Sequence, residues 1–173
     1  MTTAPVLASV VESLTHAVAP WKHAYDDSKV IDTIVVFVHL AALLVGGGIA
    51  LATDRATLRA VRGDATERER QLAELGLTHR IVVPALAVAF LSGLLLFLAD
   101  VKTFATSIAF WIKMALVASL LVNGLLMTRY ENALRRASSA DVEPWSRLRT
   151  TAVASAVLWL ATLLAGVALT NAS

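Results

Sequence analysis

Four long apolar stretches constrain the fold of this chain more than any other feature of its sequence. They cover about residues 31–53, 80–99, 105–128 and 150–170. An α-helix rises about 1.5 Å per residue, so roughly 20 apolar residues are enough to cross a hydrocarbon core about 30 Å thick. The sequence therefore predicts an all-α integral membrane protein, built as a four-helix bundle.

The composition of the whole chain agrees with this prediction. Hydrophobic residues make up 57% of the sequence and charged residues 16%, whereas soluble domains contain about 25% charged residues. The four stretches use most of the chain, so we expect one membrane domain over residues 1–173 and no separate soluble domain. Cysteine is absent, which excludes disulfides, Cys-ligated iron–sulfur clusters, thiolate-ligated haem and haem attached through C-x-x-C-H.

A shorter amphipathic segment precedes the four spans. Residues 5–19 place Val and Leu side chains on one face at helical spacing, and the opposite face is too polar to cross a membrane. We therefore expect an interfacial helix within residues 1–25 that lies flat on the membrane surface, with His16 and His23 solvated. The helices that contain the four spans are then expected at residues 30–55, 78–100, 104–136 and 141–170.

The connection between the first two spans carries several helix-boundary signals. We expect the first helix to extend beyond the membrane to about Val61 and to stop at Gly63. Asp64 and Glu67 form a plausible capping pair for the next helix. Because its charges are mixed, this next helix is predicted to be a short, solvated surface helix that ends near Gly76.

The arginines predict the orientation of the chain in the membrane. Six lie between the first and second spans and five between the third and fourth, namely Arg55, Arg59, Arg62, Arg68, Arg70 and Arg80, then Arg129, Arg135, Arg136, Arg147 and Arg149. By the positive-inside rule both loops face the cytoplasm. We expect a multi-pass protein of the inner (cytoplasmic) membrane with both termini on the periplasmic side. The net charge of +2 then reflects topology and does not indicate a nucleic-acid partner.

Two ionisable residues interrupt the apolar stretches. His39 lies eight residues into the first span, about 12 Å below the outer surface. Lys113 lies at a similar depth in the third span, which runs in the same direction. His79 is at the opposite edge of the membrane, about 15–20 Å away along the normal. Since ionisable residues within a membrane usually mark functional sites, we expect a site that contains His39 and Lys113.

Several roles are open for these residues. The neutral imidazole of His39 suits haem iron or copper, and the ammonium of Lys113 suits a haem propionate, an anionic substrate or a proton relay. Alternatively, His39 hydrogen-bonds a neighbouring helix and Lys113 snorkels towards the interface. Gly46 and Gly47 provide either a packing notch or room for a flat ligand. Trp111 lines the same pocket or anchors the helix at the interface.

Three motifs resemble the copper-resistance protein D superfamily, which includes the haem-dependent protoporphyrinogen oxidase of the HemJ type. They are FVHLAALLVGGG in the first span, HRIVVPALAVAFLSGLLLF in the second and FWIKMALVASLLVNGLLMTR in the third, within residues 30–136. The resemblance implies that His39 is a haem ligand and Lys113 its essential companion. Where that oxidase typically has Thr-Thr-Pro-Gly, residues 82–85 read VVPA, so the resemblance does not extend to that step.

These observations together predict a membrane protein that binds one haem b. His39 is the expected metal ligand, and Lys113, Trp111, Gly46 and Gly47 are the other residues expected near the cofactor. The expected role is electron transfer or redox chemistry, with a haem-dependent oxidoreductase, similar to protoporphyrinogen oxidase, as one form of it.

Two other functions are compatible with the same sequence. One is a non-catalytic accessory subunit of a larger respiratory or photosynthetic complex, with or without a cofactor. The other is a copper permease, although the chain has only three methionines and no cysteine as soft ligands. The expected partners are membrane lipid and either a second copy of the chain or a larger membrane complex.

Overall fold

The computed structural model describes residues 3–136 and 142–172, and these residues form helices joined by short links. The helices are α1 (Thr3–Ala17), α2 (Ala19–Asp27), α3 (Lys29–Ala60), α4 (Ala65–Ala99), α5 (Val101–Thr106), α6 (Ile108–Arg136) and α7 (Val142–Ala172). Within the described ranges α3, α4, α6 and α7 are long and apolar enough to cross a membrane. The predicted all-α bundle with four spans is therefore confirmed.

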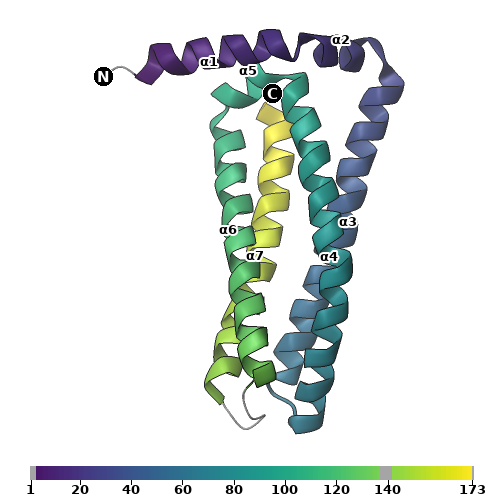
Figure 1. Cartoon of the computed structure of the whole chain (residues 1–173), viewed down its shortest axis with the longest axis vertical. Helices are drawn as coiled ribbons and strands as arrows, with labels where there is room; N and C mark the ends of the chain where they lie inside the picture. Colours follow the sequence, from purple (N-terminus) through teal and green to yellow (C-terminus); the bar gives the residue numbers. More distant parts are fainter. Residues whose placement is uncertain (1–2, 137–141, 173) are drawn as a thin grey trace.

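The four long helices stand side by side, while α1 and α2 lie across one end of the bundle (Figure 1). Helix α3 packs along α4, and α6 packs along α7. The main contact between these two hairpins is made by α3 and α7, whereas α4 and α6 do not pack closely over the described residues. The bundle is thus two helical hairpins joined along one side.

The N-terminal segment is divided into two helices where the sequence suggested one. The backbone leaves the helical conformation at Val18, and Pro20 lies in the first turn of α2. Proline is favoured there because it has no N–H to place in the preceding turn. His16 and His23 are both exposed, as expected.

Helix α2 is fastened to the end of α4 by two long side chains. The indole Nε1 of Trp21 donates to the carbonyl oxygen of Leu95 at 2.9 Å. The Nζ atom of Lys22 donates to the carbonyl oxygen of Ala99 at 3.3 Å. Ala99 is the last residue of α4, so its carbonyl has no partner within the helix, and Lys22 of α2 satisfies it.

A further hydrogen bond joins α2 to the start of α3. The hydroxyl of Tyr25 donates to Oδ1 of Asp32 at 2.5 Å. Burial, together with this hydrogen bond and the neighbouring carboxylate charges, raises the pKa of Tyr25 to about 12. The phenol therefore keeps its proton, and can keep donating to Asp32, at neutral pH.

The link between α3 and α4 follows the predicted boundary signals. Helix α3 ends at Ala60, and Gly63 lies in the turn that follows. The side chain of Asp64 caps α4 by accepting from the backbone N–H of Glu67 at 2.9 Å. Local capping chemistry is sufficient to define this end of the helix.

The predicted helix end near Gly76 is wrong, because α4 continues without a break from Ala65 to Ala99. Leu75, which precedes the glycine, is only 1% exposed. A Cβ atom at Gly76 would lie 3.2 Å from Nη2 of Arg135 on α6. The glycine therefore leaves room for the guanidinium of Arg135 and does not act as a stop signal.

The third membrane helix also begins later than the predicted residue 104. Residues 101–106 form the separate helix α5, and α6 begins at Ile108. Asp100 caps α5 by accepting from the backbone N–H of Thr103 at 3.3 Å. This short helix lies beside α1 at the end of the bundle that α1 and α2 cover (Figure 1).

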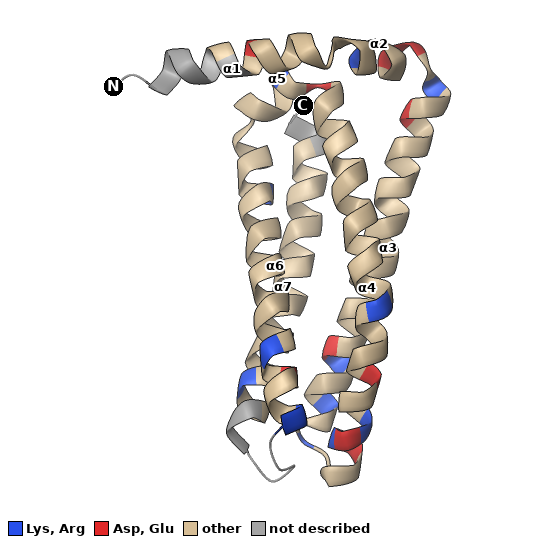
Figure 2. Cartoon of the chain, in the orientation of Figure 1, with Lys and Arg blue, Asp and Glu red and all other residues tan. Residues whose placement is uncertain are grey.

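Charged residues gather at the opposite end of the bundle (Figure 2). This end carries the link between α3 and α4 and the cytoplasmic parts predicted for α6 and α7, and we call it the Arg-rich end. A small hydrophobic core lies here, made of Leu75, Met127, Leu134, Trp145 and Leu148. Along the spans, in contrast, many large apolar side chains are exposed, as expected for a surface that faces lipid.

Replacing Leu148 with alanine tests the importance of this core. Leu148 is fully buried, so Leu148→Ala is expected to lower the free energy of unfolding by about 2–5 kcal/mol. Leu164→Ala on the same helix is the control, because Leu164 is 71% exposed. Denaturant unfolding in detergent micelles measures both changes. Equal losses in the two variants would contradict the assignment of a core at the Arg-rich end.

Candidate functional site

His39 lies on α3 and faces α4. Its Nδ1 atom is 3.0 Å from the carbonyl oxygen of Ala89 and 3.1 Å from Oγ of Ser92. A carbonyl oxygen only accepts hydrogen bonds, so Nδ1 carries the proton and Nε2 keeps its lone pair. Among the residues that the structure describes, Nε2 has no hydrogen-bond partner. A neutral imidazole held through Nδ1 is the usual arrangement of a histidine that binds a metal through Nε2.

The α4 backbone approaches the imidazole closely at Gly93. A Cβ atom at this position would lie 3.0 Å from Cε1 of His39. Ser92, next to it, is buried and donates its own hydroxyl to the carbonyl oxygen of Val88 at 2.7 Å. Ser92 and Gly93 of the second span therefore form the part of α4 that contacts the imidazole of His39.

Lys113 approaches the same region from the other hairpin. It lies on α6, is partly buried, and its Nζ atom is 3.8 Å from the position of a Cβ atom at Gly166 on α7. Its charge is close enough to act on the imidazole of His39. The structure thus brings the two ionisable side chains of the spans into one neighbourhood.

Trp111 does not join this neighbourhood. It is 60% exposed, and its Nε1 atom donates to the carbonyl oxygen of Ala105 at 3.0 Å. This hydrogen bond ties the side chain to helix α5 and not to the interior of the bundle. The position fits an interfacial anchor better than a pocket wall.

Gly46 and Gly47 are covered by side chains of neighbouring helices. A Cβ atom at Gly46 would lie 3.3 Å from Cβ of Ala85 on α4. At Gly47 it would lie 3.1 Å from the indole ring of Trp159 on α7, which is 3% exposed. This geometry favours the packing notch over room for a flat ligand.

The donor set nevertheless fits a haem. His39 offers a neutral imidazole for the iron, and Lys113 offers an ammonium for a propionate. Within the described residues no group of three or more His, Asp or Glu side chains is placed to hold a metal ion. A bound metal would therefore depend on His39 together with ligands that a cofactor brings.

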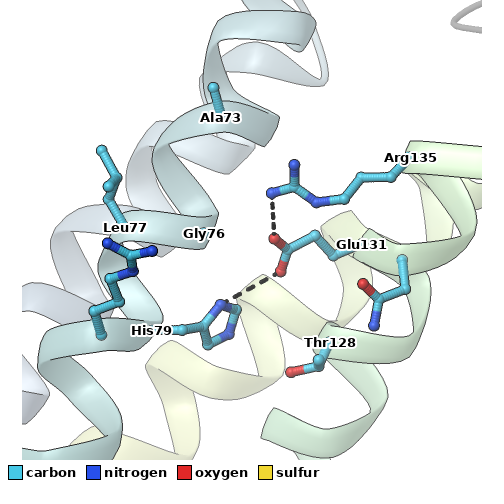
Figure 3. Close-up of a pocket in the computed structure, with 9 residues that line it drawn as sticks. Ala73, Gly76, Leu77, His79, Thr128, Glu131 and Arg135 are labelled. Carbon is cyan, nitrogen blue, oxygen red and sulfur yellow. Dashed lines mark hydrogen bonds and ion pairs between the residues drawn. The ribbon is translucent and has the colours of Figure 1, made fainter.

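A second group of polar residues lies at the Arg-rich end, where a cavity of about 430 Å³ opens between α4 and α6 (Figure 3). Glu131 on α6 is only 3% exposed. One of its carboxylate oxygens pairs with Nη2 of Arg135 at 2.9 Å, and the other lies 3.6 Å from Nδ1 of His79 on α4. His79 is thus engaged with Glu131 and takes no part in the neighbourhood of His39.

The sequence did not single out two buried carboxylates, Glu131 and Asp54. Asp54 is 3% exposed, faces Ser155 on α7, and its Oδ2 atom has no hydrogen-bond partner in the described part of the chain. The feature of the sequence that could have identified Asp54 is its position directly after the first apolar stretch. The signal for Glu131 was its spacing of four residues from Arg135, which is typical of an ion pair on a helix.

No protein-family model matches the chain, and no curated protein and no solved structure matches it either. The resemblance to the copper-resistance protein D superfamily therefore stays a prediction that depends on the three motifs of residues 30–136.

Substitution of Gly47 tests the contact between α3 and α7 that joins the two hairpins. Gly47→Leu is expected to lower the free energy of unfolding by about 1–3 kcal/mol, because the larger side chain must displace the ring of Trp159. Gly48→Leu is the matched control, since no atom of another helix lies within 4 Å of its Cβ position. Unfolding in detergent measures both variants, and an equally stable Gly47→Leu protein would contradict the tight contact.

Proposed function

We propose that this protein binds one haem b inside the membrane and that His39 is the axial ligand of its iron. The observation that carries the proposal is the orientation of the imidazole. Its Nδ1 atom is engaged by the carbonyl oxygen of Ala89 and by Ser92, and its Nε2 atom has no hydrogen-bond partner among the described residues. Such a contact fixes the tautomer and increases the basicity of the nitrogen that binds the metal.

Haem fits this site better than a bare copper ion. A copper site needs several protein ligands, and cysteine or methionine are the preferred ones for Cu(I). Around His39 the described residues offer no group of three candidate ligands, and the sequence contains no cysteine. A haem brings four nitrogen ligands of its own, so one histidine is enough to hold its iron from the protein side.

Lys113 is the proposed partner of a haem propionate. In the described part of the chain it makes no ion pair with Asp or Glu. An ammonium in a membrane span is costly unless it finds an anionic partner or reaches water. A propionate carboxylate would supply that partner and would anchor the edge of the macrocycle by a charge-assisted hydrogen bond.

The proposed role is electron transfer or redox chemistry in the inner membrane, with both termini on the periplasmic side. When bound, haem supplies one-electron redox chemistry. The residues of this chain would hold the imidazole in one orientation, pair with the propionate and keep the iron inside the apolar bundle. The resemblance of the three span motifs to the copper-resistance protein D superfamily supports the same proposal.

Absorption spectra of the purified protein test the role of His39. After haem-supplemented expression and purification in mild detergent, we expect a Soret band that is lost in His39→Ala, because the iron loses its protein ligand. The control is His79→Ala, which removes a histidine at the Arg-rich end and should keep the band. A colourless wild-type protein, or a His39→Ala protein with an unchanged Soret band, would refute haem binding by His39.

Lys113 has a separate test. Lys113→Met is expected to keep the Soret position but to bind haem roughly tenfold more weakly, since one charge-assisted hydrogen bond is lost. Lys113→Arg should restore most of the affinity, because arginine also pairs with carboxylates. Haem titration of the apoprotein measures these affinities. Equal affinity of Lys113→Met and wild type would argue against the propionate contact.

A further inference from the structure

We propose that the cavity between α4 and α6 at the Arg-rich end binds the phosphate headgroup of an anionic phospholipid. The cavity is lined by residues of α4 between Ala73 and Arg80 and residues of α6 between Thr128 and Arg135 (Figure 3). These residues lie outside the neighbourhood of His39, so this proposal does not depend on haem binding.

The position of the cavity along the helices matches the headgroup layer. The apolar stretches end at about residue 80 on α4 and residue 128 on α6. From these points the lining extends seven residues away from the apolar part on each helix, which is about 10 Å. The headgroup layer occupies roughly the first 5–8 Å outside the hydrocarbon core. The cavity therefore opens where lipid phosphates are found.

The charged groups of the cavity favour an anion. Arg80 is exposed, and within the described residues it forms no ion pair and no side-chain hydrogen bond. Arg135 uses only its Nη2 atom to reach Glu131 and the carbonyl oxygen of Leu72, which leaves its Nε and Nη1 groups without a described partner. Two arginines and one carboxylate thus line the cavity, and guanidinium is well suited to phosphate.

Glu131 organises this site. Its carboxylate is almost completely buried and lies between Arg135 of its own helix and His79 of α4 (Figure 3). It therefore fixes Arg135 through an ion pair at 2.9 Å and places its second oxygen next to His79 of α4. An arrangement already formed before the ligand arrives lowers the entropic cost of binding.

The same geometry disfavours a metal cation and favours a lipid over a soluble phosphate. Among the described residues Glu131 is the only carboxylate that lines the cavity, and it is already paired with a guanidinium. A lipid is favoured because the cavity opens in the headgroup layer, where phosphates attached to glycerol and acyl chains are concentrated.

The test compares the full-length protein in nanodiscs of phosphatidylcholine with nanodiscs that also contain phosphatidylglycerol. Native mass spectrometry measures which lipid the protein retains. We expect wild type to retain phosphatidylglycerol preferentially and Arg80→Gln to lose this preference by roughly five- to tenfold. Arg129→Gln is the control, because it removes the same charge as Arg80→Gln. Arg129 is exposed on α6 and does not line the cavity.

A second arm separates lipid from soluble phosphate. Inorganic phosphate added to the protein in phosphatidylcholine nanodiscs is expected to leave its thermal unfolding unchanged, whereas phosphatidylglycerol should raise the unfolding temperature of wild type and of Arg129→Gln. The proposal is overturned if Arg80→Gln and Arg129→Gln retain phosphatidylglycerol equally. It is also overturned if inorganic phosphate stabilises the protein as much as phosphatidylglycerol does.

Discussion

The contact between α3 and α7 holds the two hairpins of this protein together. It is tight where the backbone of Gly47 meets the ring of Trp159. Since the backbones of α4 and α6 do not pack closely over the described residues, this contact and the core at the Arg-rich end together set the relative positions of the hairpins. His39 belongs to one hairpin and Lys113 to the other, so their proximity is a property of the assembled bundle and of neither hairpin alone.

Close approach at glycine recurs at three places that matter for the proposed sites. Gly47 makes room for the ring of Trp159, Gly93 for the imidazole of His39 and Gly76 for the guanidinium of Arg135. In each case a side chain from another helix fills the space that a Cβ atom would need. Glycine lowers helix stability by about 1 kcal/mol relative to alanine, and here contacts between helices offset that cost.

Features that depend on local chemistry could be predicted from the sequence. The four spans follow from apolar stretches of sufficient length, and the start of α4 follows from the capping group of Asp64. The continuity of α4 through Gly76 could not be predicted, because Leu75 in this segment is buried against residues of α6 and α7 that lie far along the chain. The burial of Glu131 has the same origin, since a charged residue near a predicted loop gives no sign of the helix that will cover it.

The hydrophobic core at the Arg-rich end has a consequence for the vertical register of the helices. Lipid tails contact one apolar side chain as favourably as the next, so the bilayer alone allows a helix to slide along its axis by a fraction of a turn. The core around Leu75 and Leu148 joins α4, α6 and α7 at one height, through interlocking side chains like those of a soluble protein. This core therefore fixes the positions of three of the four spanning helices relative to one another along the membrane normal.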